Sequence, residues 1–439
     1  MKNTLATKSI LLLAWPAIVE NFLISAVGFV DTLFISKLGL SEVAAVGVTN
    51  AIMQIYFAVF MSIATASTIF ISRAIGENNG AKVRDITSQA ILLSLFVGLV
   101  LGAISFFFSE SMMSIMGASP DVLQVGIPYF QIVAVPSIVL SLFFTAGAIL
   151  RGSGDTRTPL RVALWMNTVH IVLDYVLIFG VFFDGFGIKG AAMATLLSRL
   201  FSVFFLLWYL HNRRVISQLR LWSIRRDLLA KLSRLATPAA LERLFMRTGQ
   251  ILYFGMIIRM GTEVYAAHTL TGNFTMFSTI VGTGLTVATT TLIGKSIGAK
   301  QIEETKNLGT VAIWVSSLVM TAVLVIVWSI SFTATHLFTD DPFVIRLIVT
   351  ILFIDVIAQP ATGAVTALTA ILQSGGDTKF PMYVTWFGIW GIRTLGVYIL
   401  GVHLGWGLVG AWIAIAMDNY IRAVILFIRY RSFRWVKQI

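Results

Sequence analysis

Long apolar segments alternate with short polar ones along the whole chain. A helix that crosses the hydrocarbon core of a bilayer needs about 20 mainly apolar residues. This template predicts an all-α integral membrane protein with twelve membrane-spanning helices. They cover residues 9–36, 42–71, 86–108, 123–149, 161–182, 188–210, 237–258, 264–293, 308–331, 345–372, 382–402 and 407–428.

Composition agrees with a membrane protein. Only 12% of the 439 residues are charged and 57% are hydrophobic, whereas soluble proteins carry about 25% charged residues. The net charge of +12 comes from short basic clusters between apolar segments, so membrane lipids are expected partners and nucleic acid is not. The chain has no cysteine, which excludes disulfides and thiolate chemistry.

Charged loops predict the orientation. The loops after the second, fourth and sixth spans are basic, whereas residues 109–121 and 333–341, after the third and ninth spans, contain no Lys or Arg. Lys and Arg collect on the cytoplasmic side of a membrane. We therefore expect a multi-pass protein of the cell membrane, inner or plasma, with both termini in the cytoplasm.

Residues 211–236 form the longest polar stretch and divide the chain near its middle. Apolar and basic residues alternate there, which suits either an amphipathic helix on the inner membrane face or a plain linker. The predicted organisation is a first lobe at 1–210, a basic linker at 211–236 and a second lobe at 237–439.

The two lobes are predicted to be repeats. An offset of 222 residues relates Pro16 to Pro238, Glu20 to Glu242, and the Gly-Asp-Thr triplet at 154–156 to that at 376–378. Each half has six spans, an even number, so both halves run in the same direction, related by a pseudo-two-fold axis along the membrane normal. Secondary transporters commonly have such repeats and bind their cargo near the midplane.

Polar residues confined to the first half are the candidate ion site. Asp31 lies inside the first span, where an ionised carboxylate costs at least about 2.5 kcal/mol, and the repeat places Tyr253 opposite it. Asp174 and Thr195 fall in the outer half of the same bundle, and His170 lies one turn before Asp174.

The chemistry of this set leaves several interpretations open. Two carboxylates in one desolvated pocket cannot both ionise easily, so at least one should bind and release a proton. Alternatively, oxygens of Asp31, Asp174 and Thr195 could ligate Na⁺. Two structural alternatives stand beside these: inter-helix hydrogen bonds without cargo, and an Asp31 carboxylate that reaches headgroup water.

The second half offers weaker candidates for a substrate site or a second ion site. Glu242 repeats Glu20, which favours a shared structural role after the proline. Asp355 is isolated in its span, with pairing to an arginine of the second half as the alternative. Tyr253 and, in the first half, Asn167 are the remaining candidates, and the spacing of Asp418 and Arg422 predicts that they pair.

No enzyme motif is present. The Leu-Ile-Gly-Lys-Ser segment at 292–296 lacks the upstream glycine of a phosphate-binding loop, and there is no His-Glu-x-x-His motif. We therefore expect a non-enzyme that needs no cofactor and uses an ion gradient.

The motifs VDTLFISKLG after Pro16, RGSGDTRTP, QSGGDTKFP, LDYVLIFG and GAAMAT together resemble the multidrug and toxic compound extrusion (MATE) family over essentially the whole chain. Because the second half lacks a cation-binding cluster, the chain looks closer to the DNA-damage-inducible (DinF) branch of the family than to its NorM branch. The resemblance implies a monomeric antiporter, without cofactor, that exports cationic amphiphilic drugs in exchange for H⁺ or Na⁺.

The family's first-half ion site falls on Asp31, Asp174 and Thr195. The family often has Asn where this chain has His170, and a titratable imidazole favours H⁺ over Na⁺. In the resulting hypothesis, protonation of Asp31 and Asp174 rearranges the first lobe, by bending the first span, and alternates access. The alternatives are a Na⁺-coupled drug antiporter and a flippase for lipid-linked precursors, which would need a cationic cleft rimmed by arginines such as Arg243, Arg247 and Arg393.

Overall fold

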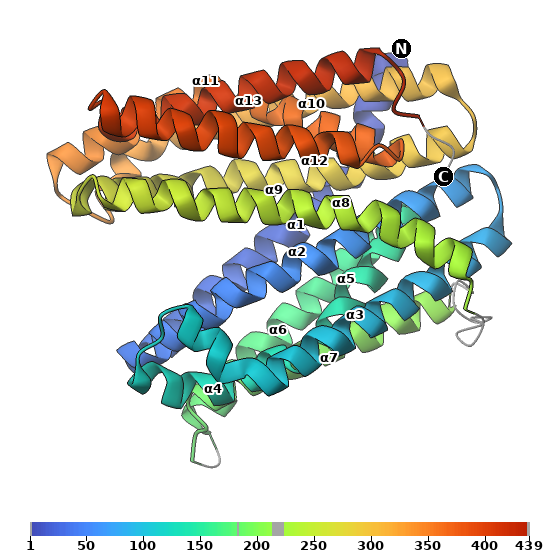
Figure 1. Cartoon of the computed structure of the whole chain (residues 1–439). Coiled ribbons are helices and arrows are strands. Elements are labelled where there is room, and N and C mark those ends of the chain that lie inside the picture. Colours follow the sequence, from blue (N-terminus) through green and yellow to red (C-terminus); the bar gives the residue numbers. More distant parts are fainter. Residues whose placement is uncertain (1, 182–183, 213–223, 437–439) are drawn as a thin grey trace. The chain divides into compact units, whose positions relative to one another are not determined.

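The protein is described here by a computed structural model that covers residues 2–181, 184–212 and 224–436. Within these residues it consists of helices without strands (Figure 1), as the sequence predicts. The helices are α1 Lys2–Ser36, α2 Leu40–Gly76, α3 Gly80–Ile115, α4 Pro120–Ala134, α5 Ser137–Gly152, α6 Arg157–Phe179, α7 Ile188–Asn212, α8 Arg226–Ile258, α9 Thr262–Gly298, α10 Ile302–Thr335, α11 Pro342–Ser374, α12 Lys379–Trp386, the π-helices η1 Phe387–Thr394 and η2 Val397–His403, and α13 Gly407–Arg431.

One predicted span is broken. The segment predicted at 123–149 consists of α4 and α5, which are bent by 44° with respect to each other. Pro136 stands at the break and caps α5. Because proline has no N–H and its ring clashes with the preceding turn, a continuous helix is disfavoured there.

The count of apolar spans differs from the prediction. Among the described residues, ten helices are long and apolar enough to cross a membrane, or eleven if α4 and α5 are one span. The predicted span at 237–258 lies within α8, which has 33 residues. It is absent from this set because Glu242, Arg243 and Arg247 make its centre polar. Eleven of the twelve predicted spans therefore meet this criterion when α4 and α5 count as one, and the twelfth is present as part of the helix α8.

The duplication is visible in the backbone. Gly154 and Gly376 both adopt positive φ, 89° and 86°, in the repeated Gly-Asp-Thr loops. Asn78 and Lys300, 222 residues apart, also share a left-handed conformation, with φ of 53° and 58°. Left-handed backbone is uncommon for residues other than glycine, so its recurrence at the same offset supports the repeat independently of sequence identity.

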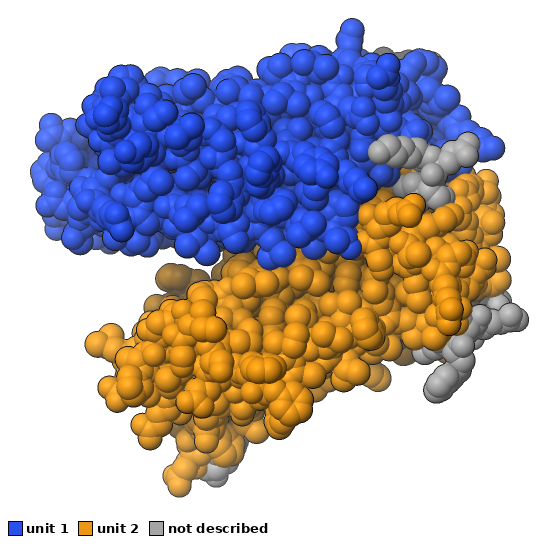
Figure 2. Space-filling model, in the orientation of Figure 1, with its two compact units in different colours: residues 1–18, 237–439 blue, residues 19–236 orange. Residues whose placement is uncertain are grey.

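The chain divides into two compact units (Figure 2). Unit 1 comprises Met1–Ile18 and Thr237–Ile439, and unit 2 comprises Val19–Ala236. The sequence-based first lobe began at residue 1, whereas the first 18 residues here belong with the second half of the chain. Helix α1 is therefore shared: its first half belongs to unit 1, and the half that carries Asp31 belongs to unit 2.

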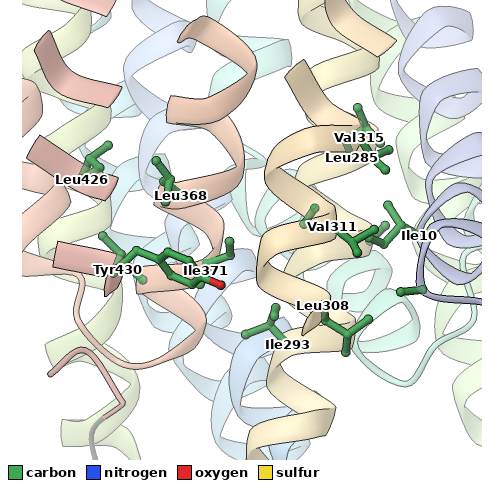
Figure 3. Close-up of a cluster of buried hydrophobic side chains, with 14 of the residues drawn as sticks. Ile10, Leu285, Ile293, Leu308, Val311, Val315, Leu368, Ile371, Leu426 and Tyr430 are labelled. Carbon is green, nitrogen blue, oxygen red and sulfur yellow. The ribbon is translucent and has the colours of Figure 1, made fainter. Parts of the chain in front are cut away.

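The packing of α1 explains its place in unit 1. Ala6, Ile10 and Ala14 are spaced one turn apart and are buried in a cluster with Leu285 and Leu308 (Figure 3). At Gly284 of α9, an added Cβ would lie 2.4 Å from Ile18 Cγ1 and 2.9 Å from the Ala14 carbonyl oxygen. The missing side chain thus lets α1 approach α9 closely, as small residues do between membrane helices.

The predicted linker is only partly described. Residues 213–223, and with them most of the proposed amphipathic helix, lie outside the described residues. From Arg226 onward the segment forms the first turns of α8, with Leu228, Leu232 and Leu235 buried. The Arg225 guanidinium donates to Asp85 Oδ2 at 2.6 Å. This end of the predicted linker is therefore the packed beginning of a long helix.

A hydrophobic core in unit 2 positions the ends of the helices that carry the candidate site. Ile35 of α1, Phe130 of α4, Ile178 of α6 and Ala191 of α7 belong to one buried cluster. Between membrane helices, such packing stabilises through van der Waals contact. The cluster therefore fixes the side chains that lie one turn away on α1, α6 and α7.

Candidate functional site

Three helices of unit 2 bring the predicted ion-site residues together. Asp31 comes from α1, His170 and Asp174 from α6, and Thr195 from α7. One carboxylate oxygen of each Asp and one ring nitrogen of His170 lie within 4.8 Å of one another. The two acids, 143 positions apart in the chain, thus belong to one polar cluster.

His170 connects the cluster to Thr195. Its Nε2 lies 3.5 Å from Asp174 Oδ2 and 3.3 Å from Thr195 Oγ1. The imidazole and the Asp174 carboxylate are four residues apart on α6, so they project from the same face. His170 therefore contacts both Asp174 and Thr195.

The acids of this pocket are not satisfied by the protein. Both carboxylate oxygens of Asp174 and Oδ1 of Asp31 are buried without a hydrogen-bond partner among the described residues. Asn167 Nδ2, one turn before His170 on α6, is also buried without a partner. Buried polar groups are normally hydrogen-bonded, so these atoms have room for a proton or a small cation. The donor set contains two carboxylates, a hydroxyl and an imidazole, which fits either.

Two further residues of unit 2 belong to the pocket and were not predicted. Arg199 follows Thr195 by one turn on α7 and interacts electrostatically with Asp31 and with His170. Tyr129 of α4 is buried and interacts electrostatically with Arg199 and both acids. A charged residue inside the predicted span at 188–210, one turn from Thr195, was the available signal for Arg199. Nothing in the sequence pointed to Tyr129.

Aromatic residues pack one turn farther along α1 and α6. Phe34 packs against Phe179 with ring centroids 5.8 Å apart and against Tyr175 at 6.4 Å. Aromatic pairs in such tilted and edge-on geometries are attractive. They hold α1 against α6 next to Asp31 and Asp174.

The repeat-related position in unit 1 has the opposite character. Tyr253, the counterpart of Asp31, is buried, and the Arg393 guanidinium lies 5.9 Å from the centre of its ring. Arg393 and Arg422 both bind Asp418, with N–O distances of 2.7 Å and 2.8 Å. The predicted pairing of Asp418 with Arg422 is therefore present, and Arg393 joins it. The Asp418 carboxylate of unit 1 is thus engaged by two arginines, whereas the Asp174 carboxylate of unit 2 has no hydrogen-bond partner among the described residues.

The other second-half candidates lie in unit 1 and are hydrogen-bonded. Glu242 accepts from Gln373 at 2.8 Å and from Thr385 at 3.1 Å. Its repeat partner Glu20 instead binds Arg151 at 3.0 Å, and Gln373 is the repeat counterpart of Arg151. Each glutamate thus contacts the same repeat position, Arg151 in one unit and Gln373 in the other. This equivalence supports a shared structural role for Glu20 and Glu242.

Asp355 accepts a hydrogen bond from Gln359 Nε2 at 3.2 Å. Gln359 Oε1 accepts in turn from Ser278 at 3.2 Å. The carboxylate also interacts electrostatically with Arg393. Asp355 therefore belongs to a polar network of α9 and α11, separate from the acid cluster of unit 2.

A duplicated bundle of apolar helices is typical of membrane transport proteins. Comparison with known families agrees. The family model described as MatE matches residues 16–176 and 238–399, one segment in each repeat. The chain belongs to the MatE family of transporters, and as such it is a multi-pass protein of the cell membrane.

Individual relatives match over nearly their whole length. The uncharacterized transporter YisQ of Bacillus subtilis strain 168 is 29% identical over 98% of this chain and 96% of its own. NorM of Thermotoga maritima, described as a probable multidrug resistance protein, is 28% identical over 98% of this chain and 93% of its own.

Solved structures show the same fold. An outward-facing multidrug resistance MATE family transporter of the MOP superfamily superposes with a TM-score of 0.90, at 24% identity, covering 99% of this chain and 97% of its own. The family prediction is thus confirmed. Its DinF branch stays a prediction.

Proposed function

We propose that this chain is a proton-driven multidrug efflux antiporter that exports cationic amphiphilic compounds. The observation that carries the proposal is the pair Asp31 and Asp174, close together in one cluster, with three buried oxygens that lack hydrogen-bond partners within the described part of the chain. The names of its relatives support drugs as the cargo.

Two neighbours favour a proton over Na⁺ as the coupling ion. His170 offers a nitrogen where an oxygen would suit Na⁺ better. Arg199 places a permanent positive charge beside Asp31, and a second cation in the same pocket would be repelled by it. A proton neutralises a carboxylate without adding a separate charge centre. Na⁺ coupling is the alternative that the same donor set allows.

Helix α1 offers a route from protonation to movement. Asp31 lies in its unit 2 half, and Pro16 lies two residues before the unit boundary at Ile18. Proline removes one hydrogen bond from the helix and permits a bend at that position. Protonation would release the attraction of Asp31 to Arg199 and the repulsion between Asp31 and Asp174, and let the second half of α1 repack within unit 2.

Substitution of the acids tests the proposal in reconstituted liposomes. With an imposed pH gradient, Asp31→Asn and Asp174→Asn should reduce drug efflux to the level of protein-free liposomes, because a carboxamide cannot carry the proton. Glu303→Gln is the control, since that exposed carboxylate pairs only with Lys306. An Asp31→Asn protein that retains pH-driven efflux would contradict proton coupling through this cluster.

The ion itself is decided in the same liposomes by imposing one gradient at a time. Efflux driven by a pH gradient in Na⁺-free buffer is expected. Efflux that requires an imposed Na⁺ gradient would instead support the Na⁺-coupled alternative.

A further inference from the structure

Buried polar atoms without partners are concentrated in unit 2. Among the described residues, eleven buried side-chain oxygen or nitrogen atoms have no hydrogen-bond partner, and nine of them belong to unit 2. Three of the nine are the oxygens of Asp31 and Asp174. Three others belong to Asn167, Ser202 and Glu20, whose side chains are at most 5% exposed. Buried polar groups that the protein leaves unpaired are normally satisfied by ordered water.

Helices α6 and α7 are antiparallel neighbours. Gly190, near the start of α7, packs against the backbone of Leu177. Thr195, five residues later, contacts His170 at 3.3 Å. Positions farther along α7 therefore lie opposite earlier positions of α6. The face of α7 that carries Thr195 carries Ser202 about two turns later.

Asn167 extends the polar face of α6 in the same direction. It precedes His170 by three residues, so both side chains project from one face. At 1.5 Å per residue, Asn167 lies about 10 Å along α6 from Asp174. Ser202 lies as far along α7 from Thr195, also away from Asp174. The two side chains therefore continue the acid cluster along the contact between α6 and α7.

Glu20 lies on the same face of α1 as Asp31. The two are eleven residues apart, which is about three turns and about 16 Å along a helix. Asp31 lies beside Asp174, and three residues later Phe34 packs against Phe179, so α1 and α6 run in the same direction. Glu20 is therefore displaced from the acid cluster toward the beginning of α6, as are the polar residues between α6 and α7.

One oxygen of Glu20 has no partner, unlike those of its repeat counterpart. Arg151 Nη1 donates to Glu20 Oε1 at 3.0 Å, whereas Oε2 is buried without a hydrogen-bond partner in the described part of the chain. Glu242 uses both of its oxygens, which accept from Gln373 and Thr385. The structural contact that both glutamates make thus leaves Oε2 of Glu20 for another role.

We propose that Asn167 and Ser202 line a water-filled path along which a proton moves from the acid cluster to Glu20. In this step the O–H bond of protonated Asp174 breaks, ordered waters pass the proton on, and an O–H bond forms at Glu20 Oε2. Asp174 becomes a carboxylate again, and Glu20 becomes neutral, which weakens its ion pair with Arg151. The inference rests on the proposed proton coupling and adds its route of release. With the predicted cytoplasmic N-terminus, Glu20 lies toward the side on which a drug exporter releases its proton.

Thiol exchange tests whether water reaches Ser202. The natural chain has no cysteine, so Ser202→Cys introduces a single S–H group whose infrared band reports exchange in D₂O. Ser316→Cys is the matched control, because the Ser316 hydroxyl of unit 1 is equally buried and also lacks a hydrogen-bond partner among the described residues. Exchange at Ser202→Cys should be complete while Ser316→Cys is still mostly protonated, because an isolated buried site has no continuous connection to bulk water.

Efflux from liposomes under a pH gradient tests whether the path carries protons. Asn167→Leu removes the amide and fills the space with carbon, and should slow efflux by about tenfold or more. Its solvent isotope effect in D₂O should rise, because proton transfer becomes rate-limiting, and Asn167→Ser should restore part of the rate. Glu20→Gln still accepts from Arg151 but cannot take up a proton, so it should slow efflux as well. Ser316→Ala should transport at the natural rate.

The outcomes separate this inference from the proposed function. Each variant is first checked for unchanged binding of the cationic dye rhodamine 6G, so that misfolding is not mistaken for a blocked path. Absence of pH-driven efflux in the natural protein would reject proton coupling and the inference with it. Equal thiol exchange at the two cysteines would overturn the inference alone. So would efflux that requires Asp31 but is unchanged in both Asn167→Leu and Glu20→Gln.

Discussion

At the scale of single residues, the two units treat a buried carboxylate in opposite ways. Asp418 binds two arginines in unit 1, and such buried ion pairs require good geometry because desolvation opposes them. Asp174 in unit 2 is as buried, but neither of its oxygens has a hydrogen-bond partner among the described residues. An unsatisfied buried carboxylate is costly, so Asp174 does not contribute to stability as Asp418 does, and this cost is consistent with the proton binding proposed above.

Arg199 gives a residue-scale prediction about ion selectivity. Arg199→Gln removes the positive charge beside Asp31 and should make room for a metal cation, so that an imposed Na⁺ gradient drives efflux that it does not drive in the natural protein. Arg199→Lys keeps the charge and should remain Na⁺-independent. Efflux from liposomes under a Na⁺ gradient alone measures the difference. Identical behaviour of Arg199→Gln and the natural protein would show that Arg199 does not exclude Na⁺.

The sequence predicted much of this cluster but not its completion. Asp31, Asp174 and Thr195 could be grouped because charges inside apolar spans are rare and because the second repeat lacks them. Arg199 and Tyr129 were missed because their role depends on which sides of α7 and α4 are turned toward α1. The orientation of each helix is set by packing between helices, and no pattern of neighbouring residues in the sequence indicates it.

At the scale of elements, α1 is a helix that contributes residues to both units. Its first half is buried among helices of unit 1 through Ala6, Ile10 and Ala14. Its second half carries Asp31 and packs into the core of unit 2 through Ile35. The sequence predicted a single span here and placed Pro16 within it, but membership in two units follows from contacts with α9 that are distant in the chain.

Two glycines of α9 test this packing. Gly284→Ala places a methyl group 2.9 Å from backbone atoms of Ala14 and Ile18, and overpacking of this kind costs about 1 to 3 kcal/mol of unfolding free energy. Gly272 lies on the same helix with nothing within 4 Å of an added Cβ. Gly272→Ala should therefore be neutral or stabilise by up to about 1 kcal/mol through helix propensity.

Thermal unfolding in detergent compares the two variants. A lower midpoint for Gly284→Ala alone is expected. Equal midpoints for both variants would show that α1 and α9 are not closely packed there.

At the scale of the whole molecule, one duplicated scaffold has diverged in chemistry more than in backbone. The left-handed residues at Gly154 and Gly376 repeat at the same offset. The buried glutamates after the prolines repeat as well, with Arg151 as partner in one unit and Gln373 in the other. At the position of Asp31, by contrast, the acid is replaced by the neutral aromatic Tyr253. Divergence at that position is what makes one unit a candidate for ion binding.

The orientation predicted from loop charges is tested by single cysteines, because the natural chain has none. Asp340 and Glu304 are both exposed and lie near opposite ends of α10. In intact cells, a membrane-impermeant maleimide should label Asp340→Cys and leave Glu304→Cys unlabelled until the membrane is permeabilised. The reverse pattern would place the termini outside.

The sequence by itself determined the class, the helices and the duplication, because the length of an apolar segment and the recurrence of residues at one offset are properties of the chain alone. It also indicated the acids Asp31 and Asp174, because a charge inside a span is visible locally. Tertiary structure decided the rest: that Asp418 binds both Arg393 and Arg422, that Arg199 interacts electrostatically with Asp31, and that α1 belongs to both units. These outcomes depend on which helix faces meet, and helix faces meet through packing between segments far apart in the sequence.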